Sequence, residues 1–442
     1  MRQGTIQGMT IKTPSNDSFI ERNLRFNLAV NLLDGGFFGL ALGFASFITI
    51  IPLFVSRMTD SALLIGLVPA IHNVGWQFPQ LLTSGWVSRA KRLKPLVLWT
   101  TIQERLPFLG LAAVAWFLPH LGTKTALVLT FILLVWQGFG GGLAANAWTS
   151  LIAKIMPTRL HGTFFGAQTA AFTALEGLAA IASGLLLDRL DGPLDFTLCF
   201  LAASAALTIS FAFLALTREA EGEAHLTEDK ASGFWQESLR ILKGNANFVS
   251  FLALRSLSQF AAMAFSFYIV YVVWTFGVNE AEAGLLTAAY MFFSILSSLV
   301  MGRLADRWNP RAVMAAGGLA ASASAAIALV APSAGWFYAS FLLTGIAIVA
   351  IWTIPLPLTV RFGSEPERPY YIGLSNTFTA PATILAPLLG GWLADTVGFQ
   401  ATFLVSVVFG LVMAGMLAFV VKDPQPKQIA APATAVQPVR ER

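Results

Sequence analysis

The sequence predicts an all-α membrane protein with twelve transmembrane helices, arranged as two pseudo-symmetric six-helix bundles. Of the 442 residues, 56% are hydrophobic and 12% are charged, which is about half the share of charge in a soluble protein. The apolar residues are gathered in runs of about 20 residues or more, the length that a helix needs to cross a bilayer. One long polar connection divides these runs into two sets of six.

The expected helices are the apolar runs between short charged or turn-forming gaps. They lie at residues 28–56, 62–84, 95–119, 124–151, 163–187, 196–216, 248–276, 281–301, 311–331, 336–360, 370–394 and 400–421. The first run is also expected to act as the insertion signal, because residues 1–25 are polar and lack the apolar core of a cleavable signal peptide. Prolines in the tenth and eleventh helices indicate either bends used in gating or static kinks.

The distribution of basic residues predicts the orientation in the membrane. Of the 28 Lys and Arg residues, 23 lie in the terminal segments and in alternate gaps, whereas the opposite gaps hold three: Arg57, Lys124 and Arg189. Because cytoplasmic loops are enriched in Lys and Arg, both termini are expected on the cytoplasmic side of a bacterial inner or plasma membrane. The basic residues form no continuous stripe, so the net charge of +5 does not indicate nucleic-acid binding.

The long connection between the sixth and seventh helices is dense in Glu, Asp and Lys. Its second part, GFWQESLRIL at 233–242, is read either as a short amphipathic helix on the membrane surface or as a solvated linker. The expected organisation is a cytoplasmic N-terminal segment at 1–27, a first bundle at 28–216, a cytoplasmic linker at 217–247, a second bundle at 248–421 and a cytoplasmic tail at 422–442.

The two sets of six helices look like repeats. The sequence GWVSR at 85–89 follows the second helix as GRLAD at 302–306 follows the eighth, an offset of 217 residues. LLIGL at 63–67 and EAGLL at 282–286 open the same two helices at an offset of 219. The sequence therefore predicts that the two six-helix halves arose by duplication and share one architecture.

The stretch GRLADRWNPR at 302–311 resembles the loop signature of the major facilitator superfamily, G-x-L-A-D-R-x-G-R. Asn309 and Pro310 stand where that pattern has its second glycine. QGFG at 137–140 is similar to the superfamily's Q-G-x-G, without the arginine usually found upstream. In the first half, Arg89 occupies the position of the family's acid. The resemblance covers both halves at superfamily level and names no subfamily.

This resemblance implies a secondary transporter in which the two halves rock about a central site, with alternating access to each side. It also implies that Asp306 and Arg307 clasp neighbouring helix ends and hold the cytoplasmic side closed, in the second half only. Asp306→Asn is then expected to favour the inward-open state. The expected gating-loop residues are Gly85, Arg89, Gly302, Asp306, Arg307 and Arg311.

Charged residues inside the apolar runs need an explanation, because a charge in hydrocarbon is costly unless it is paired or hydrated. Asp34 and Arg255 each lie roughly 10 Å from the cytoplasmic end of their helix, at 1.5 Å per residue. The repeat offset maps them close together, and the family's first and seventh helices meet across the cavity. An Asp34–Arg255 salt bridge that breaks and re-forms during transport is therefore expected. The alternative is that each residue satisfies local contacts near the interface.

Other polar residues lie within the expected spans. Glu104 and Arg105 are near the midplane of the third helix, and Glu176 shares one face of the fifth helix with two threonines. Glu104, Glu176 and His72 are candidates for proton coupling, or alternatively for interhelical hydrogen bonds and packing. The substrate or coupling candidates are Asp34, His72, Asn73, Trp76, Gln77, Glu104, Arg105, Gln137, Glu176, Arg255, Gln259, Trp352 and Asn376.

The expected function is transport of a small molecule across the cytoplasmic membrane, with proton coupling left open. The sequence has no phosphate loop, its four histidines are scattered, and Cys199 is the sole cysteine. No enzyme activity, cofactor or metal is therefore expected. The expected partners are a small-molecule substrate, protons if transport is coupled, and the lipid bilayer, and the chain is expected to be a monomer. An uncoupled facilitator and a non-transporting receptor or scaffold remain alternatives, and an intramembrane enzyme is the weakest reading.

Overall fold

The computed structural model describes residues 16–59, 61–190, 192–220, 234–278 and 280–424, and within these ranges the regular secondary structure is helical. The helices before the long connection are α1 (Asn16–Phe44), α2 (Ile50–Ser56), α3 (Ala62–Gln77), α4 (Gln80–Arg89), α5 (Leu93–Leu121), α6 (Thr123–Ile155), α7 (His161–Arg189) and α8 (Leu194–Leu216). Those after it are α9 (Phe234–Gly244), α10 (Ala246–Ala261), α11 (Tyr268–Phe276), α12 (Glu280–Arg307), α13 (Pro310–Val330), α14 (Phe337–Ile348), α15 (Pro355–Val360), α16 (Arg368–Thr396) and α17 (Phe399–Phe419).

Each of the twelve expected segments coincides with one helix or with consecutive helices. Within the described residues, ten helical segments are long and apolar enough to cross a membrane. The two other expected spans are α5 and the pair α3 and α4, which is interrupted at Phe78–Pro79. The chain is therefore an all-α protein with the helical content expected of a polytopic membrane protein.

Four expected helices are not continuous, and local hydrogen bonds explain two of the breaks. Between α1 and α2, the Ser46 hydroxyl accepts the backbone N–H groups of Ile48 and Thr49, both at 3.2 Å. Between α10 and α11, the backbone N–H of Ala264 donates to the Ser406 hydroxyl of α17 at 2.9 Å, where a 3₁₀ turn replaces the α-helix. In both places a serine hydroxyl accepts a backbone N–H that would otherwise donate to a carbonyl within the helix.

A further break lies between α14 and α15, where residues Val349–Thr353 form a π-helical turn shortly before Pro355. Proline has no backbone N–H to donate to the preceding turn, so the α-helical hydrogen-bond pattern is interrupted at this point.

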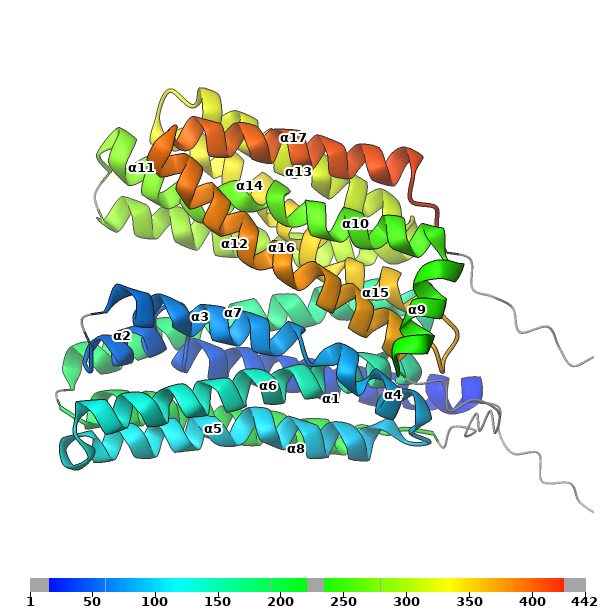
Figure 1. The fold of residues 1–442 in the computed structure, drawn as a ribbon, viewed down its shortest axis with the longest axis horizontal. Coiled ribbons are helices and arrows are strands. Elements are labelled where there is room, and N and C mark those ends of the chain that lie inside the picture. Colours follow the sequence, from blue (N-terminus) through cyan, green and yellow to red (C-terminus); the bar gives the residue numbers. More distant parts are fainter. Residues whose placement is uncertain (1–15, 60, 191, 221–233, 279, 425–442) are drawn as a thin grey trace, which may run out of the picture.

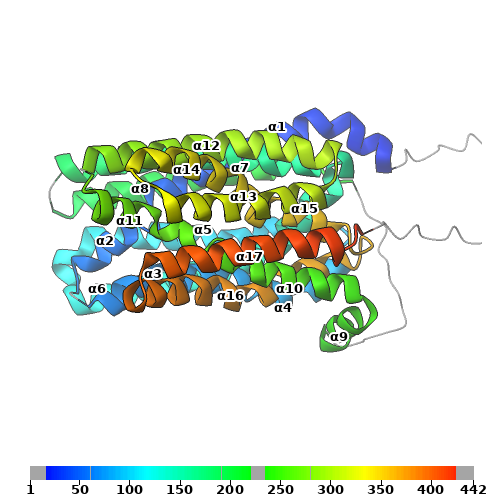
Figure 2. The same ribbon diagram turned by 90° about the horizontal axis from the view of Figure 1, so that it is seen from above.

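The helices form two bundles that lie side by side along a common axis (Figure 1). Helices α1–α8 make one bundle and α10–α17 the other. Helix α1 begins and α17 ends at the same end of the molecule, where α9 also lies (Figures 1 and 2). This end is called the terminal end below.

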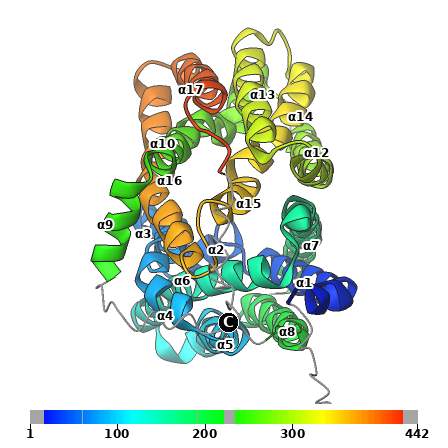
Figure 3. The same ribbon diagram turned by 90° about the vertical axis from the view of Figure 1, so that its right-hand side faces the viewer.

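Two helix pairs make the most extensive contacts between the bundles: α7 packs on α12, and α4 packs on α16 (Figure 3). Small residues allow the first of these contacts. A Cβ atom added to Gly302 would lie 2.9 Å from the Cα atom of Gly166 and would clash with the backbone carbonyl of Gly162. Close approach of backbones through glycine is typical of helix pairs in membranes. In the second contact, a Cβ at Gly373 would lie 2.8 Å from the Cα of Leu81.

The expected loops at 85–89 and 302–311 are mostly helical, which corrects the sequence reading. Gly85 and Arg89 belong to the last turns of α4, and Gly302, Asp306 and Arg307 belong to the end of α12. The break in the second half is short: Asn309 caps α13 through a hydrogen bond from the N–H of Arg311 at 2.8 Å, and Pro310 takes the first helical position.

The second part of the long connection forms α9, so the helix expected by one of the two readings of 233–242 is present, whereas its location on the membrane surface stays a prediction. Ile241 is buried in the core of the second bundle, whereas Arg240 on the exposed side pairs with Glu237 and with Glu367. These two carboxylates raise the pKa of Arg240, mainly through the hydrogen bonds from Arg240 to Glu237. Parts of the expected N-terminal segment, linker and C-terminal tail (1–15, 221–233 and 425–442) lie outside the described residues.

Candidate functional site

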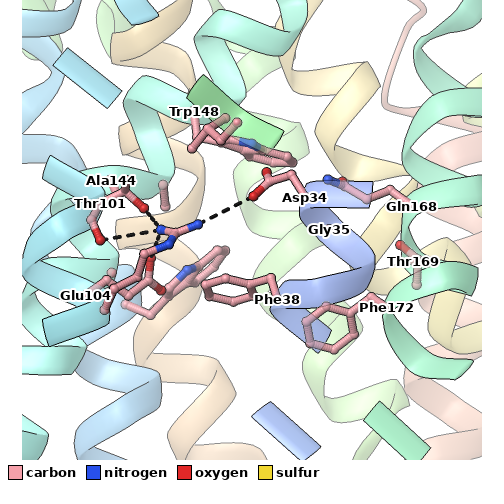
Figure 4. Close-up of a pocket in the computed structure, with 15 residues that line it drawn as sticks. Asp34, Gly35, Phe38, Thr101, Glu104, Ala144, Trp148, Gln168, Thr169 and Phe172 are labelled. Carbon is pink, nitrogen blue, oxygen red and sulfur yellow. Dashed lines mark hydrogen bonds and ion pairs between the residues drawn. The ribbon is translucent and has the colours of Figure 1, made fainter. Parts of the chain in front are cut away.

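A cavity of about 230 Å³ lies inside the first bundle. Six helices, α1, α3, α5, α6, α7 and α8, contribute to its wall (Figure 4). Its lining residues are Asp34, Gly35, Phe38, Trp76, Thr101, Glu104, Arg105, Gly141, Ala144, Ala145, Trp148, Gln168, Thr169, Phe172 and Leu214. The cavity thus brings together four of the expected site residues: Asp34, Trp76, Glu104 and Arg105.

A buried ion pair forms one side of the cavity. Nη2 of Arg105 lies 3.4 Å from Oδ1 of Asp34. The Ser210 hydroxyl donates to the same Asp34 oxygen at 2.6 Å and accepts from Arg105 Nη2 at 2.9 Å. Arg105 also donates to the Thr101 hydroxyl, one turn earlier on α5. The guanidinium and the carboxylate are therefore both held by neutral hydrogen-bonding groups, as a buried pair requires.

Glu104 adds a second carboxylate to the cavity. Its side chain is buried, and Oε2 lies 4.0 Å from Nη1 of Arg105. A Cβ atom on Gly141 of α6 would lie 2.9 Å from Oε1 of Glu104, so glycine at this position leaves space for the carboxylate. Two carboxylates and one guanidinium thus line the same space.

Aromatic rings form a large part of the remaining wall. Phe38 and Phe172 lie on the same side of the charged cluster, and Trp148 lies beside Asp34 (Figure 4). The Arg105 guanidinium lies over the Phe38 ring, 5.4 Å from its centroid, and contacts Phe211 at 6.0 Å. Ring faces attract cations electrostatically. The cavity therefore combines a large apolar surface with a few charged groups, the usual form of a small-molecule site.

The expected Asp34–Arg255 pair is not formed in this structure, because Asp34 is bonded to Arg105 and Ser210 within its own bundle. The side of α1 that carries Asp34 faces α5 and α8, not the second bundle. Arg255 instead donates from Nη1 to the Ser375 hydroxyl at 3.1 Å, and its buried Nε has no hydrogen-bond partner in the described chain. The repeat relation placed the two residues at equivalent depths, but it did not give the direction of their side chains.

Gln259 lies next to Arg255 and belongs to the second bundle. It is buried, its Nε2 donates to the Arg255 carbonyl at 3.4 Å, and its Oε1 accepts from Thr383 at 3.5 Å. These contacts join α10 to α16. Arg255 and Gln259 are not part of the cavity in the first bundle.

The expected residues of α3 point in different directions. The His72 ring stacks on Phe47 with centroids 3.8 Å apart, and its Nδ1 lies 3.1 Å from Oε1 of buried Gln137. Asn73 is exposed, Gln77 is half-buried, and only Trp76 reaches the cavity. His72 and Gln137 therefore join α3 to α6 outside the cavity.

Three further expected residues lie near the contact between the bundles or away from the cavity. Asn376 donates to Oε1 of Gln80 at 2.5 Å, so it connects α16 to α4. Glu176 is half-buried on α7 and makes no hydrogen bond to the described part of the chain. Trp352 is 42% exposed on the π-helical turn, next to Thr353, whose hydroxyl lies 3.3 Å from that of Thr169 on α7.

Asp306 joins the two bundles at the terminal end. Its Oδ1 accepts the backbone N–H of Gly162 at 2.8 Å, and its Oδ2 accepts that of Thr163 at 2.5 Å. These amides open α7, where unsatisfied N–H groups and the helix dipole favour a negative charge. Arg311 donates to the last carbonyls of α17, at Leu417 and Ala418. The Arg89 and Arg307 side chains are exposed.

The sequence reading missed several residues of the cavity. They are Phe38, Thr101, Gln168 and Phe172. Ser210, which does not line the cavity but bonds both members of the ion pair, was missed as well. The available signal was spacing: Phe38 follows Asp34 by one helical turn, and Thr101 precedes Arg105 by one turn. No comparable signal marks Ser210, because it comes from a helix more than 100 residues away in the sequence.

Comparison with known proteins gives the same fold. A family model described as Major Facilitator Superfamily matches residues 251–441. The Escherichia coli fucose:proton symporter FucP has 15% identical residues and a TM-score of 0.73, with 89% of this chain and 98% of that chain covered. The proton:xylose symporter XylE has 17% identity and a TM-score of 0.70 over 93% of this chain and 98% of that one.

A bacterial homologue of the iron transporter ferroportin, in an outward-facing state, has 15% identity and a TM-score of 0.71, over 89% of this chain and 98% of that one. Among curated proteins, an uncharacterized MFS-type transporter of Mycobacterium tuberculosis, Rv1250, is 30% identical over 144 residues, 32% of this chain and 25% of that protein.

The transcription regulatory protein OpdE of Pseudomonas aeruginosa is 29% identical over 136 residues, 31% of this chain and 34% of OpdE. The matched regions thus span a third or less of this chain, and about a third and a quarter of the two curated relatives. The solved structures, in contrast, match along both bundles. The chain therefore shares the fold of these solved transporters along both bundles, and its second bundle also matches the sequence model of the Major Facilitator Superfamily.

Proposed function

We propose that the protein is a secondary transporter that moves a small molecule across the cytoplasmic membrane by alternating access. The observation that carries this proposal is the contact of Asp306 with the start of α7. A carboxylate of one bundle caps a helix of the other bundle through two hydrogen bonds. Such a contact closes one end of the molecule and opens again without any covalent change. Rocking of two halves about a site near the midplane is the general mechanism of such folds.

The terminal end is, in this proposal, the cytoplasmic end. The enrichment of Lys and Arg in the terminal segments and in the gaps on the same side supports this orientation. The chain would then be closed toward the cytoplasm, the state in which an outward-facing transporter receives its substrate. The likeness to a ferroportin homologue in an outward-facing state is consistent with this assignment. The membrane would be a bacterial inner or plasma membrane.

The closing contacts at the terminal end are both polar and apolar, and Ile372 of α16, for example, clusters with Ala153 of α6. Besides the Asp306 contacts, the polar contacts include the Asn376–Gln80 hydrogen bond. A hydrogen bond of this kind contributes about 1 kcal/mol net, so a few of them stabilise the closed state by a few kcal/mol. A ligand or a proton that binds one state more tightly by a similar free energy shifts the equilibrium between states.

Embedded carboxylates support proton coupling as the energy source. Glu104 lies in the cavity, and Glu176 lies on α7, which packs on α12 of the second bundle. Each carries a charge that is costly in a membrane interior and that protonation removes. FucP and XylE are described as proton symporters.

Uptake into proteoliposomes tests transport and coupling together. The purified protein is reconstituted, and uptake of a labelled ligand is measured with and without an imposed pH gradient. Faster uptake with the gradient is expected. Equal rates in both conditions would reject proton coupling and leave an uncoupled facilitator.

A receptor that binds a ligand without moving it is the second candidate. The relative OpdE is named a transcription regulatory protein, which favours this reading for at least part of the chain. The two candidates differ in counterflow: a transporter exchanges labelled for unlabelled ligand across the membrane, and a receptor does not. Ligand binding with no counterflow in either direction would reject the transporter.

A further inference from the structure

The charges of the cavity do not balance. Asp34 and Arg105 neutralise each other, since Nη2 and Oδ1 are 3.4 Å apart and Ser210 bonds both groups. Glu104 reaches the same guanidinium only at 4.0 Å and through the other terminal nitrogen. Among the described residues, Lys and Arg side chains other than Arg105 do not line the cavity. The site therefore holds one carboxylate in excess.

The walls around this excess carboxylate are aromatic. Phe38, Trp76, Trp148 and Phe172 line the cavity from α1, α3, α6 and α7. Aromatic faces carry negative electrostatic potential, so they stabilise a cation and repel an anion that lies against them. The same surfaces bury an apolar or aromatic body of a ligand. The excess carboxylate and the aromatic lining thus both favour a ligand that has a positive charge and an apolar body.

The space suits a small molecule. A cavity of about 230 Å³ accommodates one aromatic ring with a short charged arm. The neutral polar groups of Gln168 and Thr169 on α7 also face this space and carry no net charge. They can accept hydrogen bonds from an ammonium group without adding a second positive charge.

We propose that this cavity binds a small organic cation with an aromatic or similarly apolar body, and that the Glu104 carboxylate holds its positive charge. The Asp34–Arg105 pair stays intact and fixes the position of the site. Ammonium compounds are therefore bound in preference to neutral and anionic compounds of the same shape. This inference rests on the proposed transport function and deepens it, because it assigns the substrate class of its site.

Three ligands of closely similar shape test the assignment. 2-Phenylethylamine is a cation at pH 7, 2-phenylethanol replaces the ammonium group with a hydroxyl, and phenylacetate is an anion. Their affinities are measured by calorimetry on the full-length protein in lipid nanodiscs, with empty nanodiscs subtracted. The amine is expected to bind at least tenfold more tightly than the alcohol, and phenylacetate more weakly than both.

A variant assigns the preference to Glu104. In Glu104→Gln the ratio of amine to alcohol affinity is expected to fall at least fivefold, with the affinity for the alcohol unchanged. Asp188→Asn removes an exposed carboxylate of α7 outside the cavity and is expected to leave the ratio as it is. If Glu104→Gln does not fold, the preference among the three ligands still decides the charge of the site.

An amine-to-alcohol ratio below tenfold in the wild-type protein, or tighter binding of phenylacetate, would overturn the inference. So would a Glu104→Gln variant that keeps the full ratio. Because calorimetry measures binding at equilibrium, these outcomes are independent of transport. Preferential binding of the amine without uptake or counterflow would contradict the proposed function alone.

Discussion

Arg105 determines the electrostatics of the cavity, because it is the one cation among the described lining residues and lies between two carboxylates. A buried charge that loses its partner is costly, whereas removing both partners of a pair is often nearly neutral. The contribution of Arg105 is therefore best measured together with that of Asp34.

Arg105→Met is expected to destabilise the protein by about 3–5 kcal/mol, the usual cost of breaking a buried ion pair. The double variant Asp34→Asn/Arg105→Met should recover a substantial part of this loss, because no unpaired partner remains from the pair. Thermal unfolding in detergent measures both. Arg57 pairs with Asp195 at 3.9 Å, and the Arg57 side chain is 60% exposed, so Arg57→Met should cost about 1 kcal/mol or less. A double variant less stable than Arg105→Met would contradict the pairing.

Charge exchange distinguishes the observed partner of Asp34 from the partner that the repeats predicted. Asp34→Arg/Arg105→Asp reverses the pair and should restore part of the ligand binding that each single change removes. Asp34→Arg/Arg255→Asp should restore none, since Arg255 is bonded to Ser375. Ligand binding by calorimetry provides the measurement. Recovery by the second exchange would show that Asp34 and Arg255 do meet during the transport cycle.

The presence of embedded charges could be predicted from the sequence, but their partners could not. A charged residue in an apolar run is visible at once, and Asp34, Glu104 and Arg105 were all identified in this way. The rotation of each helix about its own axis could not be predicted, because these helices are apolar on most sides and show no polar face that fixes their orientation. Ser210, which completes the ion pair, is one of many serines and has no distinguishing pattern.

At the scale of elements, the α7–α12 contact controls how closely the bundles approach. Gly302 and Gly166 face each other, and a Cβ atom added to Gly302 would lie only 2.9 Å from the Cα of Gly166. Asp306, one turn beyond Gly302, can reach the amides of α7 only because the two backbones are this close. The same two glycines thus determine both the packing and the capping hydrogen bonds.

Gly302→Val is expected to separate α7 from α12 and to open the terminal end. A cysteine in place of Thr169, in a Cys199→Ser background, should then react several-fold faster with a water-soluble maleimide added on that side. Gly184→Val is the matched control, because a Cβ atom at Gly184 meets nothing within 4 Å. Unchanged labelling in Gly302→Val, or equal acceleration in both variants, would reject this role of the contact.

The positions of the helices could be predicted from apolar runs, but proline marks only two of the four breaks, those at Pro79 and before Pro355. Pro69, Pro107 and Pro381 lie inside continuous α-helices. Membrane helices tolerate proline when neighbouring groups satisfy the freed carbonyl. The break between α10 and α11 has no proline and depends on a hydroxyl from α17. Such breaks depend on tertiary contacts that one sequence does not reveal.

At the scale of the whole molecule, the duplication seen in the sequence corresponds to two bundles of unequal chemistry. The first holds the cavity with its ion pair and Glu104, and the second holds Arg255 without a carboxylate within 4 Å among the described residues. The asymmetry extends to the terminal end, where Asp306 of the second bundle caps α7 while Arg89, at the corresponding position of the first, is exposed. At this end the second half therefore supplies a carboxylate that joins the bundles, and the first half has no acid at the corresponding position.

Distances between spin labels test alternating access most directly. Cysteines replace Thr158 and Glu365, exposed residues of opposite bundles that line one pocket at the terminal end, in a Cys199→Ser background. A second pair replaces Ser56 and Ser333, which are exposed on opposite bundles at the other end. Both pairs are measured by double electron–electron resonance with Asp306 intact and with Asp306→Asn. The distance at the terminal end should lengthen in Asp306→Asn while the distance at the other end shortens, whereas unchanged distances, or changes of the same sign at both ends, would contradict the account.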